Sequence, residues 1–121
     1  MTNNQMLKRQ YLETKSRAGV YAIRNQITGR ALVAGSTNVQ GTLNRHHFEL
    51  RHGHHRNAKL EQDWVEHGEA NFLFEVLDMV KPSEDPAFNV AQELEILVSM
   101  WRQEISCHGE FGYDEPRRSP R

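Results

Sequence analysis

The sequence AGVYAIRNQITGRALVAG, residues 18–35, decides the fold. It contains two short apolar runs, 19–24 and 30–35, separated by the turn-forming residues NQITG. Two such runs on either side of a glycine-containing turn predict a β-hairpin. Because successive side chains of a strand point to opposite faces, Tyr21 in the first run is expected to share a face with Gly19.

A helix-start signal follows the hairpin at once. Ser36-Thr37-Asn38 supplies capping side chains, and a polar helix rich in histidine and arginine is predicted over about 39–52. Asn57 is expected to cap a second helix over 58–67, and Gly68 is expected to end it.

The second half of the chain predicts one strand and one long helix. The strand, 71–80, carries apolar residues on both faces, which is typical of a central strand covered on both sides. A loop with two prolines, 81–86, separates it from a helix over about 88–105. A short helical extension is expected over 1–16, and a disordered basic tail over 115–121.

Composition limits the function classes. With 121 residues the chain has the size of one domain, and a formal net charge of −1 gives no global reason to expect a polyanionic partner. The single cysteine, Cys107, excludes an intramolecular disulfide and fits a reducing compartment. No apolar run approaches the roughly 18–20 residues that span a bilayer, and no signal-peptide pattern opens the chain. A cytoplasmic location without membrane contact is expected.

Several motifs in the same order resemble the GIY-YIG nuclease family. Gly19-Val20-Tyr21 and Val33-Ala34-Gly35 stand where the family has its two tripeptides. The stretch 54–64 (HHRNAKLEQDW) resembles the family pattern H-x-N-x-x-L-Q-x-D-W, and 67–77 (HGEANFLFEVL) resembles the strand that follows it. The resemblance implies an α+β domain over 17–114, with a small central antiparallel sheet of about three strands flanked by helices.

The resemblance also implies a reaction and its first site residue. Family members hydrolyse phosphodiester bonds of DNA with a divalent metal, here Mg²⁺ with Mn²⁺ as the alternative. The family phenol corresponds to Tyr21, which would activate or position the attacking water, because a phenol beside a cation becomes more acidic. Without the resemblance, a tyrosine in a strand is a packing residue.

Three basic or imidazole side chains complete the predicted catalytic set. His46 and His55 match family histidines, and the rival interpretation of His55 is a loop cap that holds Asn57. The family arginine position is Thr42, which carries no charge. Arg45 lies one turn further along the same helix face and is the candidate replacement, with a solvated or salt-bridging arginine as the alternative.

Other family positions are not matched. Val33 replaces the second tyrosine and offers no hydrogen bond. The metal-binding glutamate position is Val98, and valine supplies no oxygen for a hard cation. Glu95, one turn earlier, is the candidate metal ligand, with a solvent-facing glutamate as the alternative. Asp114 stands at the terminal asparagine position and either donates a carboxylate or ends the fold.

Local charge leaves three functional hypotheses. The segment 38–62 carries four basic and two acidic residues together with five histidines, a weakly basic face that suits phosphate contact. The spacing of these histidines argues against a structural zinc site. The hypotheses are an active divergent DNA nuclease, a catalytically degenerate module that binds DNA or RNA, and a protein-interaction module. The sequence leaves the oligomeric state open.

Overall fold

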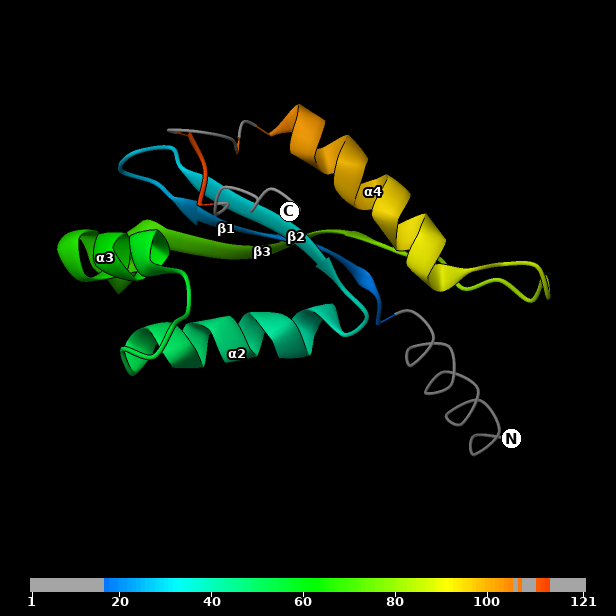
Figure 1. The fold of residues 1–121 in the computed structure, drawn as a ribbon, viewed down its shortest axis with the longest axis horizontal. Helices are drawn as coiled ribbons and strands as arrows, with labels where there is room; N and C mark the ends of the chain where they lie inside the picture. Colours follow the sequence, from blue (N-terminus) through cyan, green and yellow to red (C-terminus); the bar gives the residue numbers. More distant parts are fainter. Residues whose placement is uncertain (1–16, 106, 108–110, 114–121) are drawn as a thin grey trace, which may run out of the picture.

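The computed structural model describes residues 17–105, 107 and 111–113. Its described part is a three-stranded antiparallel sheet in the order β2-β1-β3, with helices on both faces. Figure 1 shows α4 over one face of the sheet and α2 and α3 on the other. The elements are β1 (Gly19–Asn25), β2 (Ala31–Ser36), α2 (Val39–Arg51), α3 (Ala58–His67), η1 (Glu69–Asn71), β3 (Phe72–Met79) and α4 (Val90–Glu104).

The central strand β1 divides the apolar core in two. Tyr21 and Ile23 point into the core formed with α2 and α3. Val20 and Ala22 point into the core beneath α4. This alternation follows from the two-residue period of a strand. The α+β class and the three-stranded antiparallel sheet are confirmed.

The position of β3 differs from the prediction. The sequence predicted a central strand covered on both sides, but β3 lies at the edge of the sheet and pairs only with β1 among the described strands. Leu73 and Val76 are accordingly 41% and 39% exposed. The prediction was wrong because an apolar run on both faces indicates a strand without indicating where in the sheet it pairs.

The three helices predicted within the described residues are confirmed within about two residues at each end. Asparagine side chains cap all three, as the sequence signals indicated for the first two. Asn38 accepts from the Gly41 N–H at 3.2 Å, Asn57 from the Leu60 N–H at 3.0 Å and Asn89 from the Gln92 N–H at 3.1 Å. Such a bond satisfies one of the otherwise unpaired N–H groups of a first helical turn.

A buried polar cluster fastens the hairpin turn to α3 and to the end of the domain. The Asp63 carboxylate accepts hydrogen bonds from the Tyr113 hydroxyl at 2.7 Å and from Arg30 at 2.8 Å. The Asn25 amide donates to the Tyr113 oxygen at 3.0 Å, and the Asn25 side-chain carbonyl accepts from the turn N–H groups of Ile27 and Thr28. The polar groups of this cluster are therefore paired with one another, as burial requires.

No helix in the described part of the chain is long and apolar enough to cross a membrane. The predicted helical extension 1–16, the basic tail 115–121 and Asp114 lie outside the described residues.

Candidate active site

Tyr21 joins the central strand to α2. Its side chain is buried on the α2 face of the sheet, and its hydroxyl lies 2.9 Å from His46 Nε2. His46 follows the buried Leu43 by three residues, so both side chains lie on the helix face that meets the sheet. The periodicity of α2 therefore carries the imidazole to the phenol.

His55 extends this contact from the loop after α2. Its Nε2 lies 2.7 Å from His46 Nδ1, and the two rings stack with centroids 4.9 Å apart. Two further bonds hold His55 in place: its backbone N–H donates to Glu61 Oε1 at 2.7 Å, and the Asn57 N–H donates to His55 Nδ1 at 3.0 Å. Tyr21, His46 and His55 thus form one hydrogen-bonded chain from a strand, a helix and a loop.

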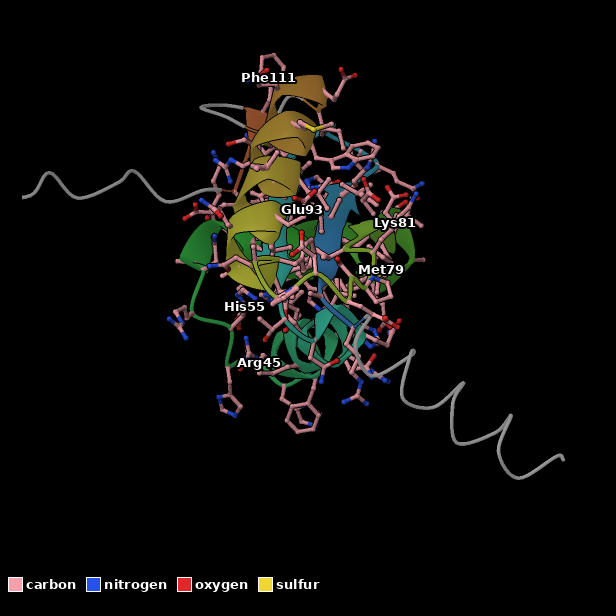
Figure 2. The ribbon with its side chains drawn as sticks, turned by 90° about the vertical axis from the view of Figure 1, so that its right-hand side faces the viewer. Arg45, His55, Met79, Lys81, Glu93 and Phe111 are labelled. Atoms are coloured by element: carbon pink, nitrogen blue, oxygen red, sulfur yellow. The ribbon has the colours of Figure 1, made fainter. Side chains whose placement is uncertain are left out.

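Charged side chains border this chain. Arg45 Nε lies 3.9 Å from Glu49 Oε2, with the arginine side chain 62% exposed. Ligand atoms of Glu49, His46 and His55 all lie within 4.8 Å of one another. In Figure 2, Arg45 and His55 are labelled on the α2 side of the sheet, whereas Glu93 is labelled on α4. Guanidinium and carboxylate groups therefore accompany the phenol and the two imidazoles.

The surroundings shift three pKa values. Burial, together with the nearby His55 and Arg45, lowers the pKa of His46 to about 4 against the opposing charge of Glu49. Burial also lowers the pKa of His55, with Glu49 and Glu61 opposing. Burial raises the pKa of Tyr21, partly offset by the charge of Arg45. At neutral pH both imidazoles and the phenol are therefore uncharged.

Two groups of described side chains have the spacing of metal ligands. At the family's glutamate position, Val98 packs against β2, and a Cβ added to Gly35 would lie 2.6 Å from its Cγ2. Near Tyr21 the possible ligands are two imidazoles and one carboxylate, a set that suits transition metals better than Mg²⁺. A second group with ligand spacing is Asp63, Glu66 and His67, whose buried Asp63 belongs to the polar cluster described above.

The structure brings four of the predicted site residues together and places the fifth elsewhere. Tyr21, His46 and His55 are in direct contact, and Arg45 lies beside them; their roles stay predictions. Glu95 is exposed on α4, across the sheet from α2, and is in neither group with ligand spacing. Its role as a metal ligand also stays a prediction.

The unmatched positions have structural explanations. Val33 is fully buried beneath α4, on the face of the sheet opposite Tyr21. The Thr42 hydroxyl is paired with Ser36 at 2.6 Å, where β2 leads into α2. Both side chains therefore contribute to packing or to a local hydrogen bond.

Sequence reasoning missed Glu49 as a member of the site. Glu49 could have been found because it lies three residues after His46 on the same helix. The Asn57 N–H corresponds to the alternative interpretation of His55 as a loop cap that holds Asn57, because this N–H donates to His55 Nδ1 at 3.0 Å. His47 packs edge-on against Trp64 and Phe74, and its side chain is 38% exposed.

Comparison with known proteins identifies the fold. The chain matches no protein-family model and no curated protein sequence. Two solved structures match it: the catalytic domain of the intron endonuclease I-TevI in a point-mutant form, with a TM-score of 0.62 and 21% identity, and the catalytic domain of the homing endonuclease I-TevI, with a TM-score of 0.61 and 22% identity. The matches cover 80% and 79% of this chain and 91% and 95% of the I-TevI chains. The chain has a GIY-YIG-like fold.

The GIY-YIG-like fold accounts for the order of hairpin, two helices, edge strand and long helix. It brings Tyr21, His46 and His55 together on one face of the sheet. On the opposite face of the sheet, α4 contributes packing residues such as Leu97 and Trp101.

Proposed function

We propose that this protein is a divergent GIY-YIG-like nuclease that hydrolyses phosphodiester bonds of DNA in a divalent-metal-dependent reaction. The observation that supports this proposal best is the convergence of the Tyr21 hydroxyl, two neutral imidazoles, a carboxylate and a guanidinium at the end of α2. A phenol and imidazoles can give or take protons, and a guanidinium can hold a phosphate.

Each side chain has a role in this proposal. Arg45 is exposed and would bind a phosphate oxygen, offsetting negative charge that grows in the transition state. Tyr21 would lie against the reacting phosphate, His46 would support Tyr21, and His55 would support His46. Glu49 offers one carboxylate beside these groups, and Mg²⁺ bound there would also need water or phosphate oxygens, so the metal is a variable of the test.

The decisive experiment is a cleavage assay on supercoiled plasmid with Mg²⁺, Mn²⁺ or EDTA. Wild-type protein should nick the plasmid in at least one metal and not in EDTA. Tyr21→Phe and His46→Ala should each lower the rate by a factor of about 100 or more, in the range of general acid–base catalysis. His52→Ala is the matched control, because His52 is exposed on the same segment and should leave the rate unchanged.

Absence of cleavage in every metal, with the protein shown to be folded, would contradict a nuclease function. Salt-dependent DNA or RNA binding in that case would favour the degenerate binding module, because the basic side chains around α2 are exposed. These side chains are Arg45, Arg51, Arg56 and Lys59.

A further inference from the structure

One hydrogen bond in the site has a direction that cannot reverse. The Asn57 backbone N–H donates to His55 Nδ1 at 3.0 Å, and a backbone N–H is only ever a donor. Nδ1 of His55 must therefore present its lone pair. A neutral imidazole carries one proton, so the proton of His55 lies on Nε2.

The Asn57 bond also fixes the donor and acceptor of the two hydrogen bonds that lead from His55 to Tyr21. His55 Nε2–H faces His46 Nδ1 at 2.7 Å, so His46 accepts at Nδ1 and carries its own proton on Nε2. His46 Nε2–H faces the Tyr21 oxygen at 2.9 Å, so the phenol oxygen accepts. The hydroxyl hydrogen of Tyr21 is then left to point to a partner other than His46.

We propose that the Asn57 backbone N–H is a positioning group that orients Tyr21 as a hydrogen-bond donor toward an anionic oxygen. The identity of that oxygen rests on the proposed function: in a nuclease it belongs to the phosphodiester group. In this arrangement Tyr21 gives a hydrogen bond or a proton to the phosphate and does not begin as a base, in agreement with burial raising the pKa of the phenol.

The same direction argues against a metal centre at His46, Glu49 and His55. A metal ion binds a nitrogen lone pair, and His55 Nε2, which faces His46, carries a proton. Binding would require His55 to move its proton to Nδ1 and lose the bond from the Asn57 N–H. The ring nitrogens of His46 and His55 are close together because they are hydrogen-bonded to each other.

Burial and side-chain hydrogen bonds hold Asn57 in place. The residue is buried, and its side-chain oxygen caps α3 through the Leu60 N–H at 3.0 Å. Its side-chain amide donates to the Tyr113 carbonyl. Helix α3 and the C-terminal segment thus hold the N–H that faces His55.

The direct test is ¹⁵N NMR of the full chain with labelled histidine at pH 7. His46 and His55 should both show a protonated Nε2 and an unprotonated Nδ1. A protonated Nδ1 on either ring would overturn the proposal. This NMR measurement does not depend on cleavage. If the tautomers are as expected but the protein never nicks DNA, the nuclease function is contradicted and the tautomer assignment stands.

A pair of variants isolates the backbone N–H. Asn57→Ala removes the cap but keeps the N–H, whereas Asn57→Pro removes both, and the φ of −85° at this position lies close to the range that proline adopts. The alanine variant should keep the Nε2–H form of His55, and the proline variant should lose it to a mixture. Identical tautomers in the two folded variants would overturn the proposal, and if the proline variant fails to fold the wild-type spectrum still decides.

A zinc titration followed in the same spectrum gives a further check. One equivalent of Zn²⁺ should leave the Nε2–H signals of both rings in place. Stoichiometric loss of these signals would mean that the cluster is a metal site, contrary to the proposal.

Discussion

The Tyr113 hydroxyl donates a 2.7 Å hydrogen bond to the Asp63 carboxylate, 50 positions away in the sequence. Arg30 donates to the same carboxylate oxygen at 2.8 Å. Burial alone would raise the pKa of Asp63, but the bonds from Tyr113 and Arg30 and the Arg30 charge outweigh it and hold the pKa below its ordinary value. The ionised form of Asp63 is therefore part of the folded state.

We expect Tyr113→Phe to lower the free energy of unfolding by about 1.5–3 kcal/mol, because a buried carboxylate loses a hydrogen-bond donor. Urea unfolding followed by tryptophan fluorescence measures this change. Lys59→Ala, an exposed substitution on α3, is the control and should change the stability by less than about 0.5 kcal/mol. Equal stabilities of the tyrosine variant and the wild type would show that the bond contributes nothing.

The stability should fall with acid between pH 6.5 and about 4. The folded state holds the pKa of His46 at about 4, below the ordinary value of 6.5, so in this window the unfolded chain binds a proton that the folded protein does not. Protonation therefore favours unfolding as the pH drops. Thermal melts of His46→Gln should show a shallower dependence over the window than the wild type, and a parallel dependence would exclude His46 as the cause.

Gly35 and Val98 should be coupled in stability. A Cβ at residue 35 would meet Val98 Cγ2 at 2.6 Å, so Gly35→Ala should destabilise the fold by about 1–3 kcal/mol through overpacking. Adding Val98→Ala should recover part of this loss, which a double-mutant cycle of unfolding free energies measures. Strictly additive effects would show that the two residues do not compete for space.

Two glutamates test where a carboxylate is needed. Glu49→Gln should lower plasmid nicking by at least about tenfold, because Glu49 lies beside His46 and His55 and its charge acts on both imidazoles. Glu95→Gln should leave the rate within about twofold, since Glu95 is exposed on α4 across the sheet. The reverse pattern would support Glu95 as the metal ligand.

Arg45 should contribute to DNA affinity through one phosphate contact. In a binding assay without metal, Arg45→Ala should weaken duplex binding similarly for all sequences and reduce the slope of log affinity against log salt by about 1. Arg24→Ala is the matched control, because Arg24 is paired with Glu75 at 2.6 Å, away from the α2 cluster. An unchanged salt slope for the Arg45 variant would exclude a phosphate contact at this residue.

The hairpin and the helices could be predicted from the sequence because their signals are local. A two-residue period places Val20 and Tyr21 on opposite faces, and asparagine caps give the starts of α2 and α3. The edge position of β3 could not be predicted in this way, because strand order depends on which strands pair. Nothing in the residues around Leu73 distinguishes an edge strand from a central one.

The candidate site was partly predictable for a similar reason. Tyr21, His46 and His55 stand at motif positions, and the fold brings them into contact. Glu49 was not predicted, because the family motif has its acidic residue in α4. Glu49 nevertheless lies three residues after His46 on one helix. The Asn57 N–H belongs to the main chain, so only the alternative interpretation of His55 as a loop cap pointed to it.

A main-chain amide sets the order of donors and acceptors in the hydrogen bonds from Asn57 to Tyr21. Nearly any substitution at residue 57 would therefore leave this order intact. Selection acting on side chains could therefore replace Asn57 at the cost of the helix cap and of the bond to the Tyr113 carbonyl, while the proton order at Tyr21 persisted. Proline is the one coded residue that would erase it. The chemistry of this site would thus be inherited through the path of the polypeptide between α2 and α3, and relatives with different residues at this position could still share it.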